Sequence, residues 1–174
     1  ASYEDKIVQL AVKKILEAIY EPRFLNCMYG FRPNRGCHDA IKEVQYQINN
    51  RCINYVVDAD IRGFFDHMSH EWMMEFLRLY IKDPNLLRLI NKYLNAGVLT
   101  DGVFEESEEC SAQGNIISPI LANIYMLNVL TLWYKFVIKS NTLGNSFLAV
   151  YADDFIAGFQ YKEDAERYYV LLKE

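Results

Sequence analysis

The sequence has few of the residues that build disulfide frameworks or zinc clusters. Its four cysteines are scattered without paired spacing, and no segment has the pattern of a signal peptide. They are Cys27, Cys37, Cys52 and Cys110. The three histidines share no metal-ligand spacing either. We therefore expect reduced thiols, and histidines that lie at helix ends or on the surface.

The chain also lacks an uninterrupted apolar run that could face lipid. Its most apolar stretch, residues 116–138, contains polar side chains where a lipid-facing span of about 20 residues would be apolar. These are Asn123, Asn128, Thr131 and Lys135. Ser118 can cap a helix here, Pro119 suits its first turn, and apolar residues occur on nearly every face. The pattern predicts a buried helix and no membrane partner.

Positive charge is scarce. The 174 residues include 18 Lys and Arg against 23 Asp and Glu, a net charge of −5. A protein that binds nucleic acid by itself usually carries an excess of base. Acid is concentrated in residues 105–109, which we interpret as a solvated loop. The composition therefore predicts that this chain alone binds nucleic acid weakly.

Hydrophobic periodicity predicts helices mixed with a few antiparallel strands. Helices are expected over 4–20, 38–49, 69–82 and 85–96, with breaks at Pro22, Asp83-Pro84 and Gly97. A small hairpin is expected around Asp101-Gly102. No repeat, low-complexity tract or flexible linker is present. These elements indicate an α+β fold.

The most informative stretch is 147–161, in which two apolar strands flank Tyr151–Asp154 (YADD). Two adjacent carboxylates at a hairpin tip repel each other and raise each other's pKa unless a cation lies between them. Aspartate is also a common turn residue, and a single one would need no further explanation. Apolar flanks on both sides indicate instead that Asp153 and Asp154 are held at the edge of a core, as a divalent metal site requires.

A third carboxylate is available at the end of an earlier strand, 54–60. Alternation places Tyr55, Val57 and Ala59 on one face and Val56, Asp58 and Asp60 on the other. We interpret Asp58 as a solvated edge residue. Asp60 lies where the strand meets the Gly63 break, and it can face the hairpin tip if the two segments pair in one sheet.

Four motifs, in this order, resemble those of group II intron-encoded reverse transcriptases, also called maturases. They are YGFRPNR at 29–35, DIRGFFD at 60–66, QGNIISP at 113–119 and YADD at 151–154. The resemblance runs from about residue 5 to residue 165. Two positions depart from the family pattern, since Ala112 stands where Pro is usual and Asn115 where a second Gly is usual.

The resemblance implies the fingers and palm of a right-hand polymerase, in which helices back a small antiparallel palm sheet. On that template the fingers comprise about 1–54 and 85–112, and the palm comprises 55–84 and 113–174. The thumb is absent. The chain opens and stops inside helical patterns, so we expect it to be a piece of a larger protein.

The resemblance also implies a two-metal phosphoryl transfer that extends a primer 3′-hydroxyl. Asp60 and Asp153, assisted by Asp154, would hold one Mg²⁺ at that hydroxyl. Asp60, the Ile61 carbonyl and Asp153 would hold a second Mg²⁺ at the triphosphate. Hard carboxylate oxygens favour Mg²⁺, with Mn²⁺ as a substitute.

Nucleotide contacts follow from the same resemblance. Phe65 would pack on the incoming sugar and exclude a 2′-hydroxyl, whereas Phe64 is expected in the core. Phe65 as a second core aromatic is the alternative. The remaining nucleotide-binding candidates are Arg62, Gln113, Gly114 and Ala152. Arg62 as a plain surface charge also stays open.

Template contacts are expected from Tyr29, Arg32 and Arg35, which combine aromatic and basic groups in one loop. A loop held by its aromatics, with solvated arginines, is the alternative. The implied partners are an RNA template, the intron RNA, a DNA primer and deoxynucleoside triphosphates, with a homodimer possible. The implied location is the bacterial cytoplasm.

Three hypotheses about function remain open. The first is the RNA-directed DNA polymerase of a mobile group II intron that also assists splicing. The second is a non-catalytic splicing cofactor that keeps the fold as an RNA-binding scaffold; the intact Asp60, Asp153 and Asp154 argue against it. The third is a reverse transcriptase of a retron or a diversity-generating element.

Overall fold

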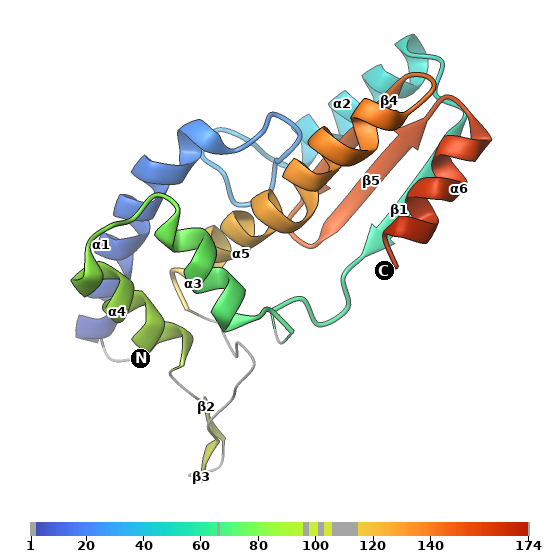
Figure 1. The fold of residues 1–174 in the computed structure, drawn as a ribbon. Coiled ribbons are helices and arrows are strands. Elements are labelled where there is room, and N and C mark those ends of the chain that lie inside the picture. Colours follow the sequence, from blue (N-terminus) through green and yellow to red (C-terminus); the bar gives the residue numbers. More distant parts are fainter. Residues whose placement is uncertain (1–2, 66, 96–97, 101–102, 106–114, 174) are drawn as a thin grey trace. The chain divides into compact units, whose positions relative to one another are not determined.

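The computed structural model describes residues 3–65, 67–95, 98–100, 103–105 and 115–173 (Figure 1). It confirms the α+β fold, with helices, a three-stranded antiparallel sheet of order β1-β5-β4 and a two-stranded sheet β2-β3. The chain divides into two compact units: Ala1–Arg23 with Arg62–Tyr125, and Phe24–Ile61 with Met126–Glu174. The boundaries of fingers and palm stay a prediction.

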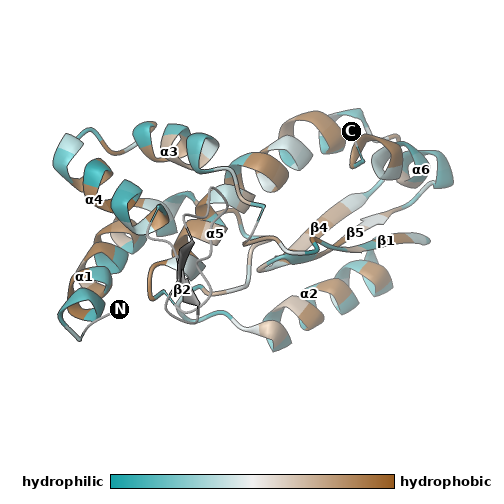
Figure 2. Cartoon of the chain, turned by 90° about the horizontal axis from the view of Figure 1, so that it is seen from below, coloured by the Kyte–Doolittle hydropathy of each residue, from teal (hydrophilic) through white to brown (hydrophobic). Residues whose placement is uncertain are grey.

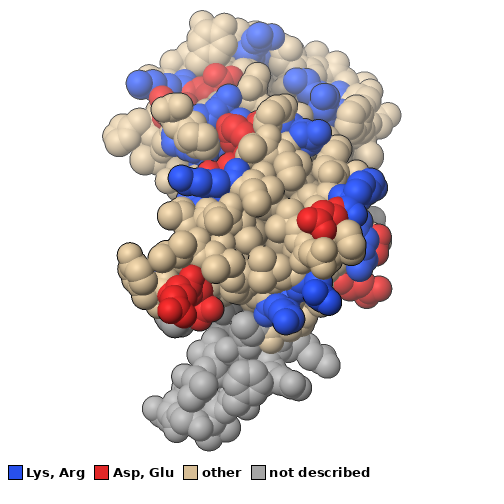
Figure 3. Space-filling view, turned by 90° about the vertical axis from the view of Figure 1, so that its left-hand side faces the viewer, with Lys and Arg blue, Asp and Glu red and all other residues tan. Residues whose placement is uncertain are grey.

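The first unit is built from helices and one short hairpin. Its elements are α1 (Tyr3–Tyr20), η1 (Glu21–Arg23), α3 (His70–Arg78), α4 (Pro84–Leu94), β2 (Val98–Thr100), β3 (Val103–Glu105) and α5, which runs over Ser118–Met126. The hairpin expected near residue 101 is confirmed by the β2-β3 pairing. On the face shown in Figure 3, acidic and basic side chains are interspersed among uncharged surface.

Capping and packing explain where the helices of this unit begin and end. The Ser69 hydroxyl accepts a hydrogen bond from the Trp72 N–H (3.4 Å), and the Asp83 carboxylate accepts one from the Asn85 N–H (2.8 Å). The predicted helix 69–82 ends earlier, at Arg78, and the Lys82 ammonium donates to the Arg78 carbonyl (2.8 Å). A lysine near a helix C-terminus satisfies carbonyls that the helix leaves free, which explains the earlier end.

The second unit contains the three-stranded sheet. Its elements are α2 (Cys37–Asn50), β1 (Tyr55–Asp60), η2 (Leu127–Thr131), η3 (Tyr134–Ile138), η4 (Lys139–Asn141), β4 (Ser146–Tyr151), β5 (Asp154–Phe159) and α6 (Lys162–Leu171). Helix α2 covers part of one face of the sheet, and η2–η4 with α6 cover the other (Figures 1 and 2). In Figure 2, β4 and β5 are largely apolar, as strands between two layers require.

The face of the sheet that η2–η4 and α6 cover holds the largest buried rings of this unit. Phe159 and Tyr168 are fully buried, and their ring centroids lie 5.2 Å apart. Tyr134 from η3 meets the Tyr168 ring edge-on at 6.0 Å. These aromatic contacts join the sheet to both helices above it, because each large ring buries apolar area against the next.

The predicted apolar helix is present as Ser118–Asn141, with π-helical turns in its second half. By length and composition it could cross a membrane, yet 56% of its most apolar window is buried inside the structure. The core helix of a soluble protein has the same properties, so the helix is weak evidence for a membrane span.

Candidate functional site

The two adjacent aspartates lie at a tight hairpin between β4 and β5. Strand β4 ends at Tyr151, β5 begins at Asp154, and these two residues pair across the turn. The two-residue turn is Ala152-Asp153, and Ala152 has φ of 59°. A positive φ at the first central position is the pattern of a type II′ hairpin, and it is strained for a residue other than glycine. The turn therefore holds Asp153 and Asp154 in a defined but costly backbone conformation.

Asp60 lies directly opposite Asp154 in the pairing of β1 with β5. The Val150 N–H donates to the Cys27 carbonyl (2.8 Å), and the Val150 carbonyl accepts from the Tyr29 N–H (2.8 Å). Both backbone groups of Val150 therefore point away from Phe155, its partner on β5. Backbone alternation then makes Asp60 and Asp154 a pair without mutual backbone hydrogen bonds, whose Cα atoms lie about 4.5 Å apart. The pairing of Asp60's strand with the aspartate hairpin, on which the predicted three-carboxylate site depends, is thus confirmed.

The predicted alternation of β1 is also observed. Asp58 and Asp60 are exposed, whereas Val57 and Ala59 are half-buried. Asp58 pairs with Ile156, which places it on the same face of the sheet as Asp60 and Asp154. Asp58 is exposed as expected, but it stands beside the other acids.

Electrostatic repulsion among these acids acts on Asp154. Partial burial, followed by the charges of Asp60, Asp153 and Asp58, raises the pKa of Asp154 above its ordinary value. Like charges disfavour ionisation, and a bound cation would remove the penalty. The cluster is therefore unfavourable as an isolated surface feature and suited to a cation.

Among the residues that the structure describes, no three His, Cys, Asp or Glu side chains already lie together as a metal-binding group. The donors that face one another across β1 and β5 are carboxylates, and Ile61 adds a backbone carbonyl at the end of β1. Hard oxygen donors of this kind fit Mg²⁺ or Mn²⁺, which also accept water and phosphate oxygens. The donor set fits a divalent ion that completes its shell with substrate.

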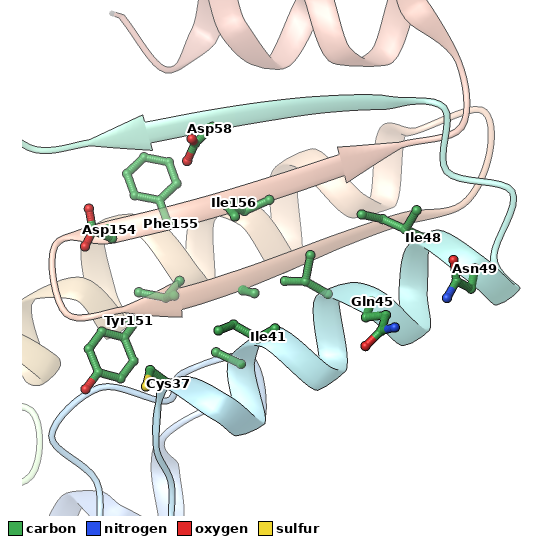
Figure 4. Close-up of a pocket in the computed structure, with 14 residues that line it drawn as sticks. Cys37, Ile41, Gln45, Ile48, Asn49, Asp58, Tyr151, Asp154, Phe155 and Ile156 are labelled. Atoms are coloured by element: carbon green, nitrogen blue, oxygen red, sulfur yellow. The ribbon is translucent and has the colours of Figure 1, made fainter.

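A cleft of about 710 Å³ opens between α2 and the face of the sheet that carries the acids (Figure 4). Ile41 and Ile48 of α2 form one wall, and Ile156 lies on the floor. Asp154 and Tyr151 stand at one end of it and Asn49 at the other. An apolar trough with carboxylates at one end can hold a ligand against reactive groups.

The loop that precedes α2 supports the hairpin. Arg32 is only 9% exposed, and its guanidinium donates to the carbonyls of Leu25 (2.8 Å) and Met28 (3.0 Å). Arg35 donates to the Asn26 carbonyl (2.8 Å) and lies over the ring of Tyr29. The two arginines thus hold the loop, and the buried Arg32 is not the solvated arginine that the alternative expected. Their template contacts stay a prediction.

Other expected site residues are placed as follows. Phe64 is 5% exposed and lies in the core of the first unit, while the half-buried Phe65 meets it edge-on at 5.5 Å. Arg62 is exposed and Ala152 is buried. Gln113 and Gly114 lie outside the described residues. The nucleotide contacts of all these residues stay a prediction.

Sequence reasoning missed two features of the site. Met28 forms a parallel bridge with Val150, which attaches the loop to the free edge of β4. The apolar stripe of α2, formed by Ile41, Val44 and Ile48, lines the cleft without any residue of the helix being fully buried. The glycine between Tyr29 and Phe31 was the available signal for the first feature, because a lone glycine between large side chains often marks a close approach of two backbones.

The whole chain, residues 1–174, matches the family described as reverse transcriptase (RNA-dependent DNA polymerase). It thus belongs to the reverse transcriptases, and within them to the group II intron reverse transcriptases, or maturases.

Three relatives illustrate this similarity. Over 125 residues the chain is 40% identical to group II intron-encoded protein LtrA of Lactococcus lactis subsp. cremoris, which covers 72% of this chain and 20% of that protein. It is 41% identical to a 91 kDa protein in the cob intron of Schizosaccharomyces pombe, covering 72% of this chain and 15% of that protein. Nuclear intron maturase 1 of Arabidopsis thaliana is 28% identical over 92 residues, which cover 53% of this chain and 13% of that protein. The chain thus spans a fifth or less of these relatives.

Proposed function

We propose that the protein containing this chain is the RNA-directed DNA polymerase of a mobile group II intron. It adds deoxynucleotides to a primer 3′-hydroxyl and is therefore a nucleotidyltransferase. The observation that carries the proposal is the register of β1 against β5, which sets Asp60 opposite Asp154 and next to the Asp153 turn. Phosphoryl transfer depends on the positioning and neutralisation of charge, and this arrangement serves both.

Each acidic residue has a distinct place in the proposed site. Asp60 comes from the end of an edge strand, and Asp153 and Asp154 come from the strained turn that faces it. Together with the Ile61 carbonyl they would hold two Mg²⁺ ions, for which Mn²⁺ can substitute. When bound, such ions activate the attacking hydroxyl and neutralise charge on the triphosphate. The register of β1 against β5 keeps Asp60 and Asp154 on one face of the sheet, and the turn places Asp153 next to Asp154 in the chain.

Nucleotide selection is assigned to residues around the acids in the family motifs. Phe65 would press on the sugar and leave no room for a 2′-hydroxyl, which selects deoxynucleotides. Arg62 would contact the triphosphate, and Gln113, Gly114 and Ala152 would contact the nucleotide. On this proposal the fingers comprise about 1–54 and 85–112 and the palm comprises 55–84 and 113–174.

RNA is the proposed template, and intron RNA is the proposed splicing partner. The names of two relatives, an intron-encoded protein and an intron maturase, support this role over a retron or a diversity-generating element. A purely structural splicing cofactor would not need Asp60, Asp153 and Asp154 together, since the charges of the first two, after burial, raise the pKa of Asp154. The proposed location is the bacterial cytoplasm, which the similarity to the Lactococcus protein supports.

Primer extension by the full-length protein tests the proposal. A DNA primer annealed to an RNA template, with deoxynucleotides and Mg²⁺, should be extended, and removal of divalent ions with EDTA should stop extension. The same protein should bind intron RNA whether or not Mg²⁺ reaches the acids. Failure to extend any primer with Mg²⁺ or Mn²⁺ would leave the non-catalytic splicing cofactor as the better hypothesis.

A further inference from the structure

Gly30 lies against the backbone of the aspartate turn. A Cβ atom added to Gly30 would overlap the backbone nitrogen of Ala152, and it would lie 3.1 Å from both the Ala152 Cα and the Tyr151 carbonyl carbon. All three are main-chain atoms, which cannot rotate away as the end of a long side chain can. Only glycine permits this approach of the loop to the hairpin.

The loop that carries Gly30 is fastened to β4 immediately beside the turn. The Tyr29 N–H donates to the Val150 carbonyl (2.8 Å), and the Val150 N–H donates to the Cys27 carbonyl (2.8 Å). The buried Arg32 guanidinium also donates to the Met28 carbonyl (3.0 Å). A side chain at Gly30 could therefore not be accommodated by a shift of the loop alone.

The turn is the part that would have to yield. Ala152 already has φ of 59° and is 7% exposed, so its conformation depends on the surrounding contacts. Any displacement of Ala152 passes directly to Asp153, the next residue, and then to Asp154 opposite Asp60.

We propose that Gly30 is a positioning residue for the catalytic carboxylates, acting through the backbone of Ala152. This inference rests on the function proposed above and adds to it a residue distant in sequence from the acids. Magnesium demands near-ideal octahedral geometry, so small shifts of its ligands weaken its binding. A misplacement of about 1 Å in a catalytic group can cost about 10²-fold in rate.

The test compares three glycine-to-alanine variants of the full-length protein. Gly30→Ala carries the proposed effect. Gly36→Ala is the matched control in the same loop, because its Cβ would meet only the Asp39 carboxylate, at 3.9 Å. Gly158→Ala controls for lost stability, because its Cβ would lie 2.7 Å from Phe147 Cδ1 and 2.9 Å from Ile53 Cγ2, in the same sheet but away from the turn.

Three quantities are measured for each variant: the thermal midpoint, kcat for primer extension and the Mg²⁺ concentration that gives half-maximal rate. Gly30→Ala should lower kcat at least tenfold and raise the Mg²⁺ midpoint severalfold, while far-ultraviolet circular dichroism shows a folded protein. Gly36→Ala should match the wild type. Gly158→Ala should lower the thermal midpoint and leave the Mg²⁺ midpoint unchanged.

Two outcomes would overturn the inference. One is a Gly30→Ala variant with wild-type kcat and Mg²⁺ midpoint. The other is a Gly158→Ala variant whose Mg²⁺ midpoint rises as far as that of Gly30→Ala, since a general loss of stability would then explain both.

Failure of the proposed function would look different, because the wild-type protein itself would extend no primer. Hydrogen exchange would then decide the inference without any activity. The amides of Ala152 and Asp153 should exchange at least tenfold faster in Gly30→Ala than in the wild type. Equal exchange rates would overturn the positioning role.

Discussion

Asp60 and Asp154 face each other across two antiparallel strands, at a position where strand alternation leaves no backbone hydrogen bond between them. Such pairs bring side chains closer than hydrogen-bonded pairs do. Two carboxylates in this position are destabilising by themselves. The pair therefore lowers the stability of the sheet at the place where the proposed chemistry would use the two carboxylates.

Asp153→Ala should abolish primer extension and leave RNA binding largely unchanged. The substitution removes a proposed metal ligand from the turn and touches no core contact of the sheet. Extension and filter binding of labelled intron RNA measure the two properties. Glu166→Gln is the control, since Glu166 only forms an exposed ion pair with Lys162 (3.1 Å), and it should extend primers within about twofold of the wild-type rate. Normal synthesis by Asp153→Ala would refute the metal assignment.

Asp154→Asn should stabilise the metal-free protein at neutral pH. Burial, followed by the charges of Asp60, Asp153 and Asp58, raises the pKa of Asp154 in the folded state, so its ionisation lowers the free energy of unfolding as pH rises through that range. Removing one of two opposed like charges on paired strands is worth about 0.2–1 kcal/mol. Thermal unfolding in EDTA at pH 7 measures the gain.

The gain from Asp154→Asn should shrink as the pH falls, because the wild-type carboxyl then becomes protonated. Saturating Mg²⁺ should also diminish it, since the ion stabilises only the intact ligand set. A variant equally stabilised with and without Mg²⁺ would indicate that Asp154 has no part in holding the metal.

Asp58→Asn should shift the acidic limb of the extension rate toward lower pH. Burial is the largest cause of the raised pKa of Asp154, followed by Asp60, Asp153 and Asp58, and the variant removes the last of these charges. A lower pKa keeps Asp154 ionised, and hence able to bind metal, at more acidic pH. A pH–rate profile of kcat measures the shift. An unchanged limb would show that Asp154 does not set it.

Phe65→Ala should admit ribonucleotides more readily. If the ring excludes the 2′-hydroxyl, its removal should lower the preference for deoxynucleotides by roughly 10–100-fold, the range expected for one added hydroxyl in a tight pocket. The ratio of kcat/KM for dNTP and rNTP measures this. Phe64→Leu is the comparison, because Phe64 is buried and its replacement should lower stability without changing the ratio. An unchanged preference in Phe65→Ala would remove Phe65 from the sugar site.

Local sequence patterns predicted the hairpin and the alternation of β1. Two apolar strands around YADD placed the turn within residues 151–154, and the structure narrows it to residues 152 and 153. Alternation separated Asp58 and Asp60 from Val57 and Ala59. These features depend on neighbouring residues, so periodicity reveals them.

Long-range pairing was less accessible to sequence reasoning. The bridge between Met28 and Val150 depends on the whole fold, since neither residue carries a strand pattern that names its partner. The end of α3 at Arg78 likewise depended on a side-chain contact from Lys82. Registers and helix ends are set by tertiary contacts that no local pattern contains.

Helix α2 has no fully buried residue, although its Ala40 and Val44 pack against Phe147 and Ala149. Ile41 remains 62% exposed on the same helix. An element with so little buried apolar area separates from its neighbours at a lower free energy than the sheet does. We therefore expect the wall of the cleft that α2 forms to open locally at a lower free energy than the floor that the paired strands form.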